Sequence, residues 1–293
     1  MSLLPSATEI VFQLGLGDQL RAVTFECDYP VAARGLPQVS RTSLPDGELS
    51  PAEIDAEVTS RVETGEPLYT LDAELIRRID PDLILTQDLC RVCAVPAGAV
   101  DQALETIGCH AAVVSLDPHR LDEVISCVGD VGAATGTEAP AAELMTDLRG
   151  RVTRVQDRVR NEPQPRVLVL EWGDPPFNAG HWVPDMVEAA GATSVLAAAG
   201  ESSRRLTWDE IATAGAEIIV FMPCGFNLDA AVEQAGPVLA RPELDSVSTF
   251  YAVDGNAFFS RPGPRLVDGV EMLAELFHPS EASLMPPGAA RLR

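Results

Sequence analysis

Apolar residues follow two alternating patterns along the chain. Short continuous apolar runs are typical of buried strands, and apolar residues that recur every three or four positions are typical of helices. The runs predict strands at residues 21–25, 81–86, 110–116, 165–172, 216–223 and 248–255. The helical spacing, with its caps and its glycine or proline stops, predicts helices at residues 5–20, 50–58, 71–80, 95–108, 119–136, 137–163, 183–191, 207–215, 228–240 and 263–279. Strands that alternate with helices predict an α/β fold whose parallel sheets are covered on both faces.

The alternation stops in the middle of the chain. No strand candidate lies between Leu121 and Arg160, and apolar residues keep helical spacing along one long helix at about residues 137–161. A chain of 293 residues is long enough for two cores. We therefore predict two Rossmann-like lobes joined by this long backbone helix, with a ligand cleft between them. The expected boundaries are an N-terminal lobe at 1–118, linker helices at 119–163, a C-terminal lobe at 164–279 and a disordered tail at 280–293.

The two predicted lobes share a local pattern. Residues 72–85 and 207–220 align at a constant offset of 135, and each segment is a short acidic helix that leads into a β-branched strand. This echo supports two lobes of the same α/β type.

Charge excludes several classes of function. The formal net charge is −23 and the chain contains no lysine, so its positive charges are all arginines. An acidic chain of this kind is a poor binder of nucleic acid, and it has neither a Schiff-base lysine nor a P-loop lysine. No apolar run approaches the roughly 18 residues that a membrane span needs, which predicts a soluble protein. The start of the chain has no signal-peptide pattern, so a cytoplasmic location is expected as the sequence stands, and an extracytoplasmic one if the true N-terminus is longer. A monomer is expected.

Aromatic residues gather in the loops that follow predicted strands. These loops hold Tyr29, Trp172, Phe177, Trp182, Phe226, Phe258 and Phe259, in a chain that is only 5% aromatic. In open parallel sheets ligands bind beyond the carboxyl ends of the strands, so the loops predict a surface for a flat or apolar ligand. The alternative is that Trp172 and Phe259 cap the core of their own lobe.

The sequence gives little support for catalysis. It contains neither a Gly-x-Ser-x-Gly elbow nor a His-Glu-x-x-His motif, and His181 is the one histidine in a predicted cleft loop. We therefore expect a binding protein rather than an enzyme.

Four segments carry a family resemblance. "SLLPSATEIVFQLGLGDQLRAVTFECDYP", "PDLILTQDLC", "EWGDPPFNAGHW" and "SRPGPRLVDGVEML" together resemble the vitamin B12 and iron-siderophore substrate-binding proteins of ABC importers, over about residues 2 to 278. The resemblance implies two lobes bridged by a long helix, with cobalamin held in the cleft and no catalytic activity. It also implies an apolar strand just before residue 2, where Met1 stands.

The resemblance assigns roles to individual residues. It implies ligand contacts at Ser6, Ala7, Asp28, Tyr29, Tyr69, Gln87, Asp88, Trp172, Pro176, Phe177, Phe259 and Arg261, to which we add His181 and Trp182 from the same loop as Phe177. It further implies that one acidic residue on each lobe docks onto arginines of a membrane permease. Those positions match Glu74 and Asp209, with Glu210 adjacent, on the two helices paired by the internal repeat.

Cys90-x-x-Cys93 admits three interpretations. The six cysteines are scattered, which is typical of reduced thiols. The pair follows a predicted strand and is interpreted as the lip of the ligand cleft, as a metal or cobalt-axial contact together with Cys27 and His181, or as a redox pair. Classical zinc sites need two such pairs, or one pair with suitably spaced histidines.

The resemblance therefore implies reversible binding of a corrinoid, cobalamin in the first place, between the two lobes. Haem and ferric siderophores also suit a cleft ringed by aromatic residues. The alternatives from other classes are a cytoplasmic zinc-binding or redox protein that uses Cys27, Cys90, Cys93 and His181, and an enzyme that acts on a tetrapyrrole.

Overall fold

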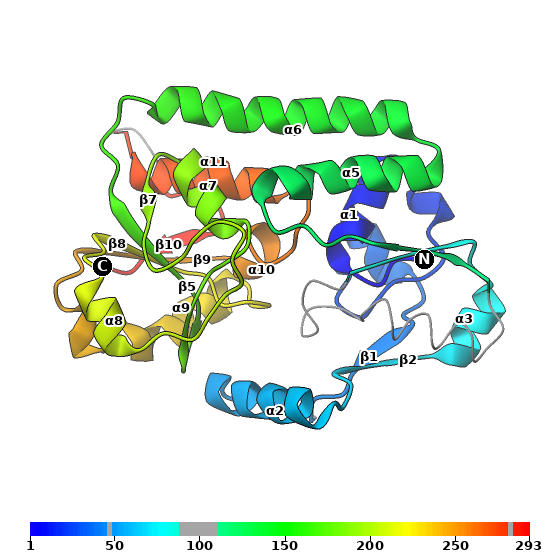
Figure 1. Cartoon of the computed structure of the whole chain (residues 1–293), viewed down its shortest axis with the longest axis horizontal. Helices are drawn as coiled ribbons and strands as arrows, with labels where there is room; N and C mark the ends of the chain where they lie inside the picture. Colours follow the sequence, from blue (N-terminus) through cyan, green and yellow to red (C-terminus); the bar gives the residue numbers. More distant parts are fainter. Residues whose placement is uncertain (46–48, 88–109, 281–283) are drawn as a thin grey trace. The chain divides into compact units, whose positions relative to one another are not determined.

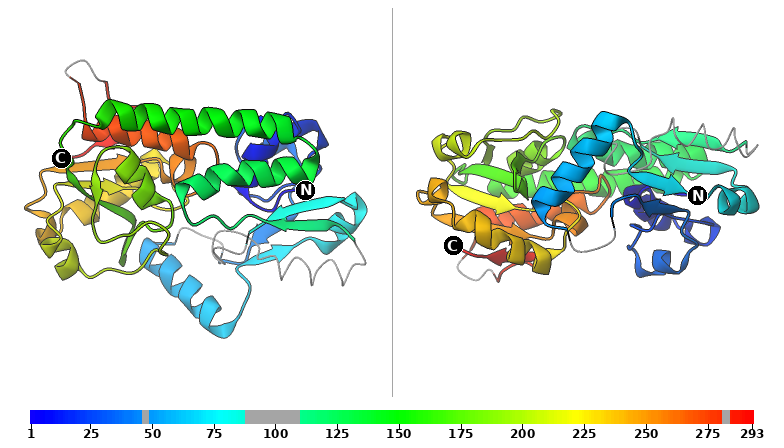
Figure 2. Two further views of the ribbon diagram at one scale, coloured as in Figure 1. Left: turned by 45° about the horizontal axis from the view of Figure 1, so that its top comes forward. Right: turned by 90° about the horizontal axis from the view of Figure 1, so that it is seen from below.

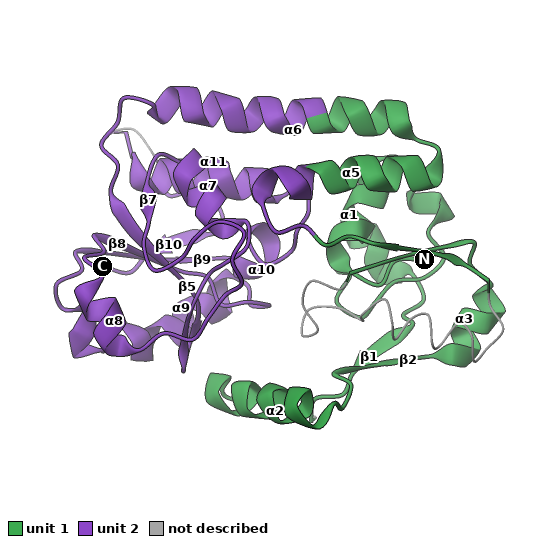
Figure 3. Ribbon diagram, in the orientation of Figure 1, with its two compact units in different colours: residues 1–117, 126–145 green, residues 118–125, 146–293 purple. Residues whose placement is uncertain are grey.

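The computed structural model describes residues 1–45, 49–87, 110–280 and 284–293, and it divides into two compact α/β units (Figure 3). Unit 1 comprises residues 1–117 and 126–145, and unit 2 comprises residues 118–125 and 146–293. The boundary between the units falls inside two helices, α5 (Leu121–Thr135) and α6 (Glu138–Val159). The predicted linker segment is thus shared between the units.

Unit 1 is built from short elements (Figure 1). Besides its parts of α5 and α6, its described helices are α1 (Pro5–Gln13), α2 (Pro51–Thr64) and α3 (Ala73–Ile79), with two 3-10 turns at Gly17–Gln19 and Val31–Gly35. Its described strands are β1 (Ser40–Thr42), β2 (Tyr69–Leu71), β3 (Leu83–Thr86) and β4 (Ala112–Ser115). Strands β3 and β4 pair in parallel, as the alternation predicts, whereas β1 and β2 form an antiparallel pair that the apolar pattern does not predict.

The core of unit 1 forms around β3. Ile84 is fully buried and packs with Leu3, Ala22, Val39 and Ile76. Residues 1–3 lie beside β3, because Ser2 bridges Leu85 and the amide of Leu3 donates to the carbonyl of Leu85 over 2.8 Å.

The predicted strand at 21–25 is wrong. Val23 makes only an isolated parallel bridge, to Gln38. The amide of Val23 donates to the carbonyl of Pro37 and its carbonyl accepts from the amide of Val39, but Pro37 has no N–H with which to extend the pairing toward residue 21. Ala22 and Val23 are buried in the core nevertheless, which explains their apolar character.

Helix α2 is inserted between β1 and β2. It begins at Pro51 behind a capping box, in which Ser50 and Glu53 each accept from the other's backbone amide, and it ends at Gly65, whose φ of 73° is left-handed. None of its residues is buried. Its strong end signals and weak apolar face explain why a helix forms here without contributing to a core.

Unit 2 contains the larger sheet, of order β10-β9-β8-β5-β6 with β7 paired to β5. The strands are β5 (Arg166–Gly173), β6 (Pro176–Asn178), β7 (Thr193–Ser194), β8 (Ile218–Phe221), β9 (Thr249–Val253) and β10 (Ala289–Arg291). The helices are α7 (Val183–Ala189), α8 (Trp208–Thr213), α9 (Leu228–Leu239), α10 (Gly255–Phe258) and α11 (Leu266–Phe277), with a 3-10 turn at Pro242–Leu244. Strands β5, β8 and β9 are parallel, and all four residues of β8 are buried, as a continuous apolar run predicts.

The prediction of a disordered tail is wrong for residues 289–291. They form β10, which pairs antiparallel with β9 in the register Ala289 to Val253. Arg293 donates from its guanidinium to the carbonyl oxygens of Leu239 and Leu244. Backbone pairing and these side-chain bonds hold the segment, and neither requires the apolar run by which a strand is recognised in a sequence.

Helix α11 lies alongside the part of α6 that belongs to unit 2 (Figures 1 and 2). Leu148, Val155 and Val159 form the buried face of this part of α6. Arg151 of α6 bonds the carboxylates of Asp268 and Glu271 on α11. Among the described residues, no helix combines the length and the apolar character that crossing a membrane requires.

Candidate functional site

The β5–β6 hairpin of unit 2 and the loop after β8 together carry three partly exposed aromatic residues. Trp172 and Phe177 face each other across the antiparallel pair, so their side chains lie on the same face. The ring of Phe226, from the loop after β8, lies 5.9 Å from that of Trp172 at an angle of 48°. We call Trp172, Phe177 and Phe226 the aromatic row. Their partial exposure leaves apolar ring surface in contact with solvent, which is the property expected of a ligand contact.

Residues 196–206 run along β6 and the residues that follow it. The amide of Leu206 donates to Pro176, that of Asn178 to Arg204, and that of His181 to Glu201. Gly180 fits closely against this segment, because a Cβ there would come within 2.4 Å of the amide nitrogen of Ser203. The ladder of hydrogen bonds explains why a segment without apolar periodicity is ordered.

Asn178 ties the segment together with its side chain. Its amide group donates to the carbonyl of Leu196 over 2.6 Å and accepts from the amide of Arg204 over 2.6 Å. The residue is only 3% exposed. A pocket of about 310 Å³ lies inside the segment, lined by residues that include Asn178, Gly180, Leu196 and Arg204.

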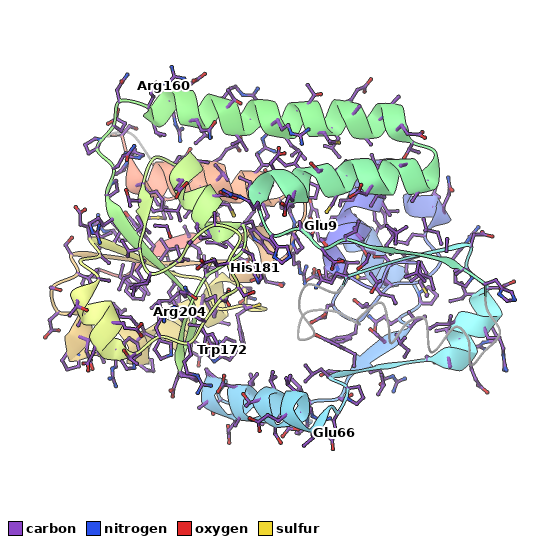
Figure 4. All side chains as sticks on the ribbon, viewed as in Figure 1. Glu9, Glu66, Arg160, Trp172, His181 and Arg204 are labelled. Carbon is purple, nitrogen blue, oxygen red and sulfur yellow. The ribbon has the colours of Figure 1, made fainter. Side chains whose placement is uncertain are left out.

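Arg205 brings a positive charge to the aromatic row. It bridges Phe177 in an antiparallel pair, and its guanidinium carbon lies 5.5 Å from the centre of the Phe177 ring. This distance is typical of a cation–π interaction. Figure 4 marks the neighbouring Arg204 together with Trp172 and His181 on unit 2.

Trp182 and Phe259, both predicted to contact ligand, are buried. Trp182 is 6% exposed and Phe259 is 1% exposed. The indole nitrogen of Trp182 donates to the carbonyl of Phe259 over 2.8 Å. These two side chains pack unit 2 itself, which favours the interpretation of Phe259 as a cap of its own lobe. Pro176 is buried as well, whereas Arg261 is partly exposed.

His181 has an unusual environment. Its φ of 53° is left-handed, its ring stacks on Trp182 at 5.6 Å, and the ring of His119 lies 5.8 Å away. Its Nδ1 is buried and has no hydrogen-bond partner among the residues that the structure describes. Burial, and secondarily the nearby His119, lowers the pKa of His181 below its usual value of about 6.5. This lowered pKa favours the neutral form of the imidazole.

The predicted contacts of unit 1 are of two kinds. Ser6, Ala7 and Gln87 are buried, with exposures of 2%, 0% and 3%. Tyr29 is 43% exposed, and Asp28 and Tyr69 are partly exposed. The centre of the Tyr69 ring lies 6.1 Å from the centre of the Phe25 ring. Tyr29 and Tyr69 thus offer ring surface, while Ser6 and Ala7 belong to the buried face of α1. Asp88 lies outside the described residues.

Cys27 is a buried thiol bonded to hydroxyl groups. It is 2% exposed, and its Sγ lies 3.2 Å from Oγ1 of Thr8 and 3.1 Å from Oγ1 of Thr24. Within the described parts of the chain, no three side chains of His, Cys, Asp or Glu gather as they would around a metal ion. The predictions for Cys90 and Cys93 fall outside those parts.

The acidic residues predicted to dock onto a permease differ from one another. Glu74 and Asp209 are exposed in the first turns of α3 and α8. Glu210 instead closes the capping box of α8, where its Oε2 accepts from the amide of Thr207, and its Oε1 accepts from Arg204 over 3.0 Å. These bonds lower the pKa of Glu210.

Asn178, Arg205 and His119 were not among the predicted site residues. The sequence has no pattern that pairs residues 176–181 with 196–206, since these segments meet through backbone hydrogen bonds. The alternation of residue types around Phe177 is the one signal in the sequence that could have indicated a strand there.

The chain matches the model of the family described as "Periplasmic binding protein" over residues 1–249. It is 25% identical over 290 residues to an uncharacterized ABC transporter substrate-binding lipoprotein, YvrC, of Bacillus subtilis, covering 95% of this chain and 79% of that protein. It is also 25% identical over 288 residues to a cobalamin-binding protein of Halobacterium salinarum, covering 95% of this chain and 69% of that one.

Solved structures share the fold. A periplasmic haem-binding protein of Pseudomonas aeruginosa superposes with a TM-score of 0.73 at 23% identity, over 99% of this chain and 96% of that chain. The periplasmic vitamin B12-binding protein BtuF of Vibrio cholerae superposes with a TM-score of 0.67 at 20% identity, over 93% of each chain. The predicted fold class, two α/β lobes of the periplasmic binding protein type, is confirmed.

Proposed function

Since this chain belongs to the periplasmic binding protein family, we propose that it binds a corrinoid, cobalamin in the first place, for delivery to an ABC importer. The observation that carries the proposal is the aromatic row, which presents the partly exposed rings of Trp172, Phe177 and Phe226 on one hairpin and a neighbouring loop. Flat metal chelates bind to such ring surfaces through dispersion and burial of apolar area. We propose no catalytic step.

Relatives narrow the class of ligand without fixing the ligand. One relative is named for cobalamin, and a structural neighbour is named for haem. We place cobalamin first because the sequence relative named for a ligand covers 95% of this chain. Haem is the second candidate, and the partly exposed tyrosines Tyr29 and Tyr69 suit either ligand.

Titration of the purified chain separates these ligands. Hydroxocobalamin, haemin and a ferric siderophore are added in turn, and heat and the visible spectrum are recorded. We expect saturation at one site with hydroxocobalamin. Trp172→Ala is expected to weaken binding by about tenfold or more. The stacking of a flat ring system, such as a nucleic-acid base, on an aromatic side chain is worth roughly 1–3 kcal/mol.

Trp172→Phe serves as the matched control, because it keeps a ring at the same place. We expect it to retain most of the affinity. Failure of all three chelates to bind the wild-type chain would remove the proposal, and saturation by haemin alone would move it to haem. Equal affinity of Trp172→Ala and wild type would show that the aromatic row is not the contact surface.

Docking to a permease is the second part of the proposal. Glu74 and Asp209 are exposed carboxylates at the starts of two short helices related by the internal repeat. Charge reversal at either position is expected to weaken co-purification with the cognate permease while ligand affinity stays unchanged. The control is Glu66→Arg, an exposed carboxylate of unit 1 that lies outside both helices. Equal losses in all three variants would mean that general charge, rather than these two positions, governs docking.

A further inference from the structure

Three side chains from three adjacent segments line up on one face of unit 2. Trp172 of β5 opposes Phe177 of β6, and Phe177 opposes Arg205 of the 196–206 segment. Directly opposed residues of antiparallel pairs project to the same side. The row of partly exposed rings therefore continues into a guanidinium, which lies 5.5 Å from the Phe177 ring.

From this alignment we propose that Arg205 selects ligands that carry an anionic oxygen group, a carboxylate or a phosphodiester, at the edge of a flat metal chelate. A chelate stacked against Trp172 and Phe177 has its periphery next to Arg205. A guanidinium presents planar N–H donors that match two oxygens of such a group. This inference rests on the proposed function and adds the chemical character of the ligand edge.

The charge of the whole chain makes this cation significant. A chain of net charge −23 repels anions at long range, so an anionic ligand needs a local positive group to bind. Arg205 is exposed, and stacking on Phe177 limits the directions in which its long side chain points. A preoriented cation loses less conformational entropy when it binds an anion.

Asn178 is the positioning residue for Arg205. It lies between Phe177 and the segment that carries Arg205, and it bonds Leu196 at one end and Arg204 at the other, each over 2.6 Å. Its buried amide thereby fixes the backbone next to Arg205 in register with Phe177. Replacement by alanine removes both side-chain bonds and so weakens the hold on the segment, while the backbone bonds and the guanidinium itself remain in place.

Matched ligand pairs test the proposal. Hydroxocobalamin is compared with cobinamide, which lacks the phosphodiester and its nucleotide, and haemin is compared with its dimethyl ester. For Arg205→Gln we expect about a 10- to 100-fold loss of affinity for the anionic member of whichever pair binds, as for a lost charge-assisted hydrogen bond. The member that lacks the anionic group is expected to bind the variant and the wild type alike.

The variants separate positioning from structural damage. Asn178→Ala is expected to lower the affinity for the anionic member of the pair selectively. The double variant is expected to lose little more affinity than Arg205→Gln alone, because both changes act on one contact. Arg241→Gln is the control, since Arg241 also stacks on a ring, that of Trp208 at 4.6 Å, and does not belong to the row. Thermal unfolding of each variant is recorded in parallel, and the exposed Arg205→Gln decides the matter if Asn178→Ala does not fold.

The outcomes distinguish this inference from the proposed function. Wild-type binding with equal losses for both members of a pair, or with no loss, overturns the role of Arg205 and leaves the proposed function standing. No binding of any chelate by the wild type overturns both. A selective loss of affinity for hydroxocobalamin, relative to cobinamide, identifies the edge of a corrinoid as the group that Arg205 contacts. A selective loss of affinity for haemin, relative to its dimethyl ester, identifies the edge of a haem.

Discussion

Unit 2 contains two groups of aromatic residues that look alike in the sequence and differ in the fold. Trp182 and Phe259 are at most 6% exposed and are joined by a hydrogen bond from the indole to the backbone. Trp172, Phe177 and Phe226 are partly exposed and contact one another or Arg205. The first group supports unit 2 from within, and the second group presents ring surface outward.

The difference teaches that position after a strand does not by itself identify a ligand contact. All five residues lie in or next to loops that follow strands of one sheet. The route of residues 176–182 decides between them: Trp172 and Phe177 are paired on the hairpin, and the chain then turns inward at His181, which has a left-handed φ of 53°. Substitutions in the two groups should therefore have opposite effects on stability and on binding.

The largest expected effect is on the stability of Phe259→Ala. Removing a fully buried phenylalanine leaves a cavity and costs about 3–5 kcal/mol. Trp172→Ala is expected to cost much less, because part of its ring is already in contact with water, while it weakens ligand binding. Urea unfolding of both variants and ligand titration of Trp172→Ala measure the contrast. Similar losses of stability in the two variants would abolish the distinction between the groups.

Helix α8 offers the same contrast among charged residues. Glu210 closes the capping box with Thr207 and pairs with Arg204, whereas Asp209 is exposed beside it. Glu210→Ala is expected to lower the free energy of unfolding by clearly more than Asp209→Asn does, since it removes the reciprocal bond of the box. Asp209→Asn is expected to cost only a few tenths of a kcal/mol, through the helix dipole. Urea unfolding of both variants measures the contrast, and an equal loss of unfolding free energy in Asp209→Asn and Glu210→Ala would contradict it.

The smallest expected effect concerns His181, whose ring stacks on the buried Trp182. Burial lowers the pKa of His181 in the folded state, so below the ordinary value of about 6.5 the unfolded chain takes up a proton that the folded chain does not. The stabilisation is complete above that pH and falls as the pH decreases toward the lowered pKa. Carboxylates with lowered pKa values lose their contribution at lower pH, so the two windows differ.

His181→Asn isolates this contribution, because asparagine tolerates a left-handed φ. The difference in unfolding free energy between wild type and variant should shrink from pH 8 to pH 5.5 as measured in urea. A difference that stays constant across this range would mean that His181 titrates alike in both states.

Most of the strands that the sequence predicts well are largely buried. The runs at Arg166–Gly173 and Ile218–Phe221 form parallel strands of the sheet of unit 2, and Leu83–Thr86 forms a parallel strand of unit 1. Most of their side chains are buried, and this burial produces the continuous apolar runs. Strands β1, β2, β6 and β10 escape prediction because backbone hydrogen bonds to a neighbour hold them, and that neighbour is not encoded locally.

The candidate site divides in the same way. The sequence by itself determined the α/β class, the long helix and the presence of aromatic residues in loops after the strands. Only the tertiary structure decided which aromatics face outward, that Ser6 and Ala7 are buried, and that Arg205 lies against Phe177. The physical reason is that periodicity records how much of a side chain is buried. Which distant segment a residue meets depends on the register of backbone pairing, and that register is fixed only when the chain folds.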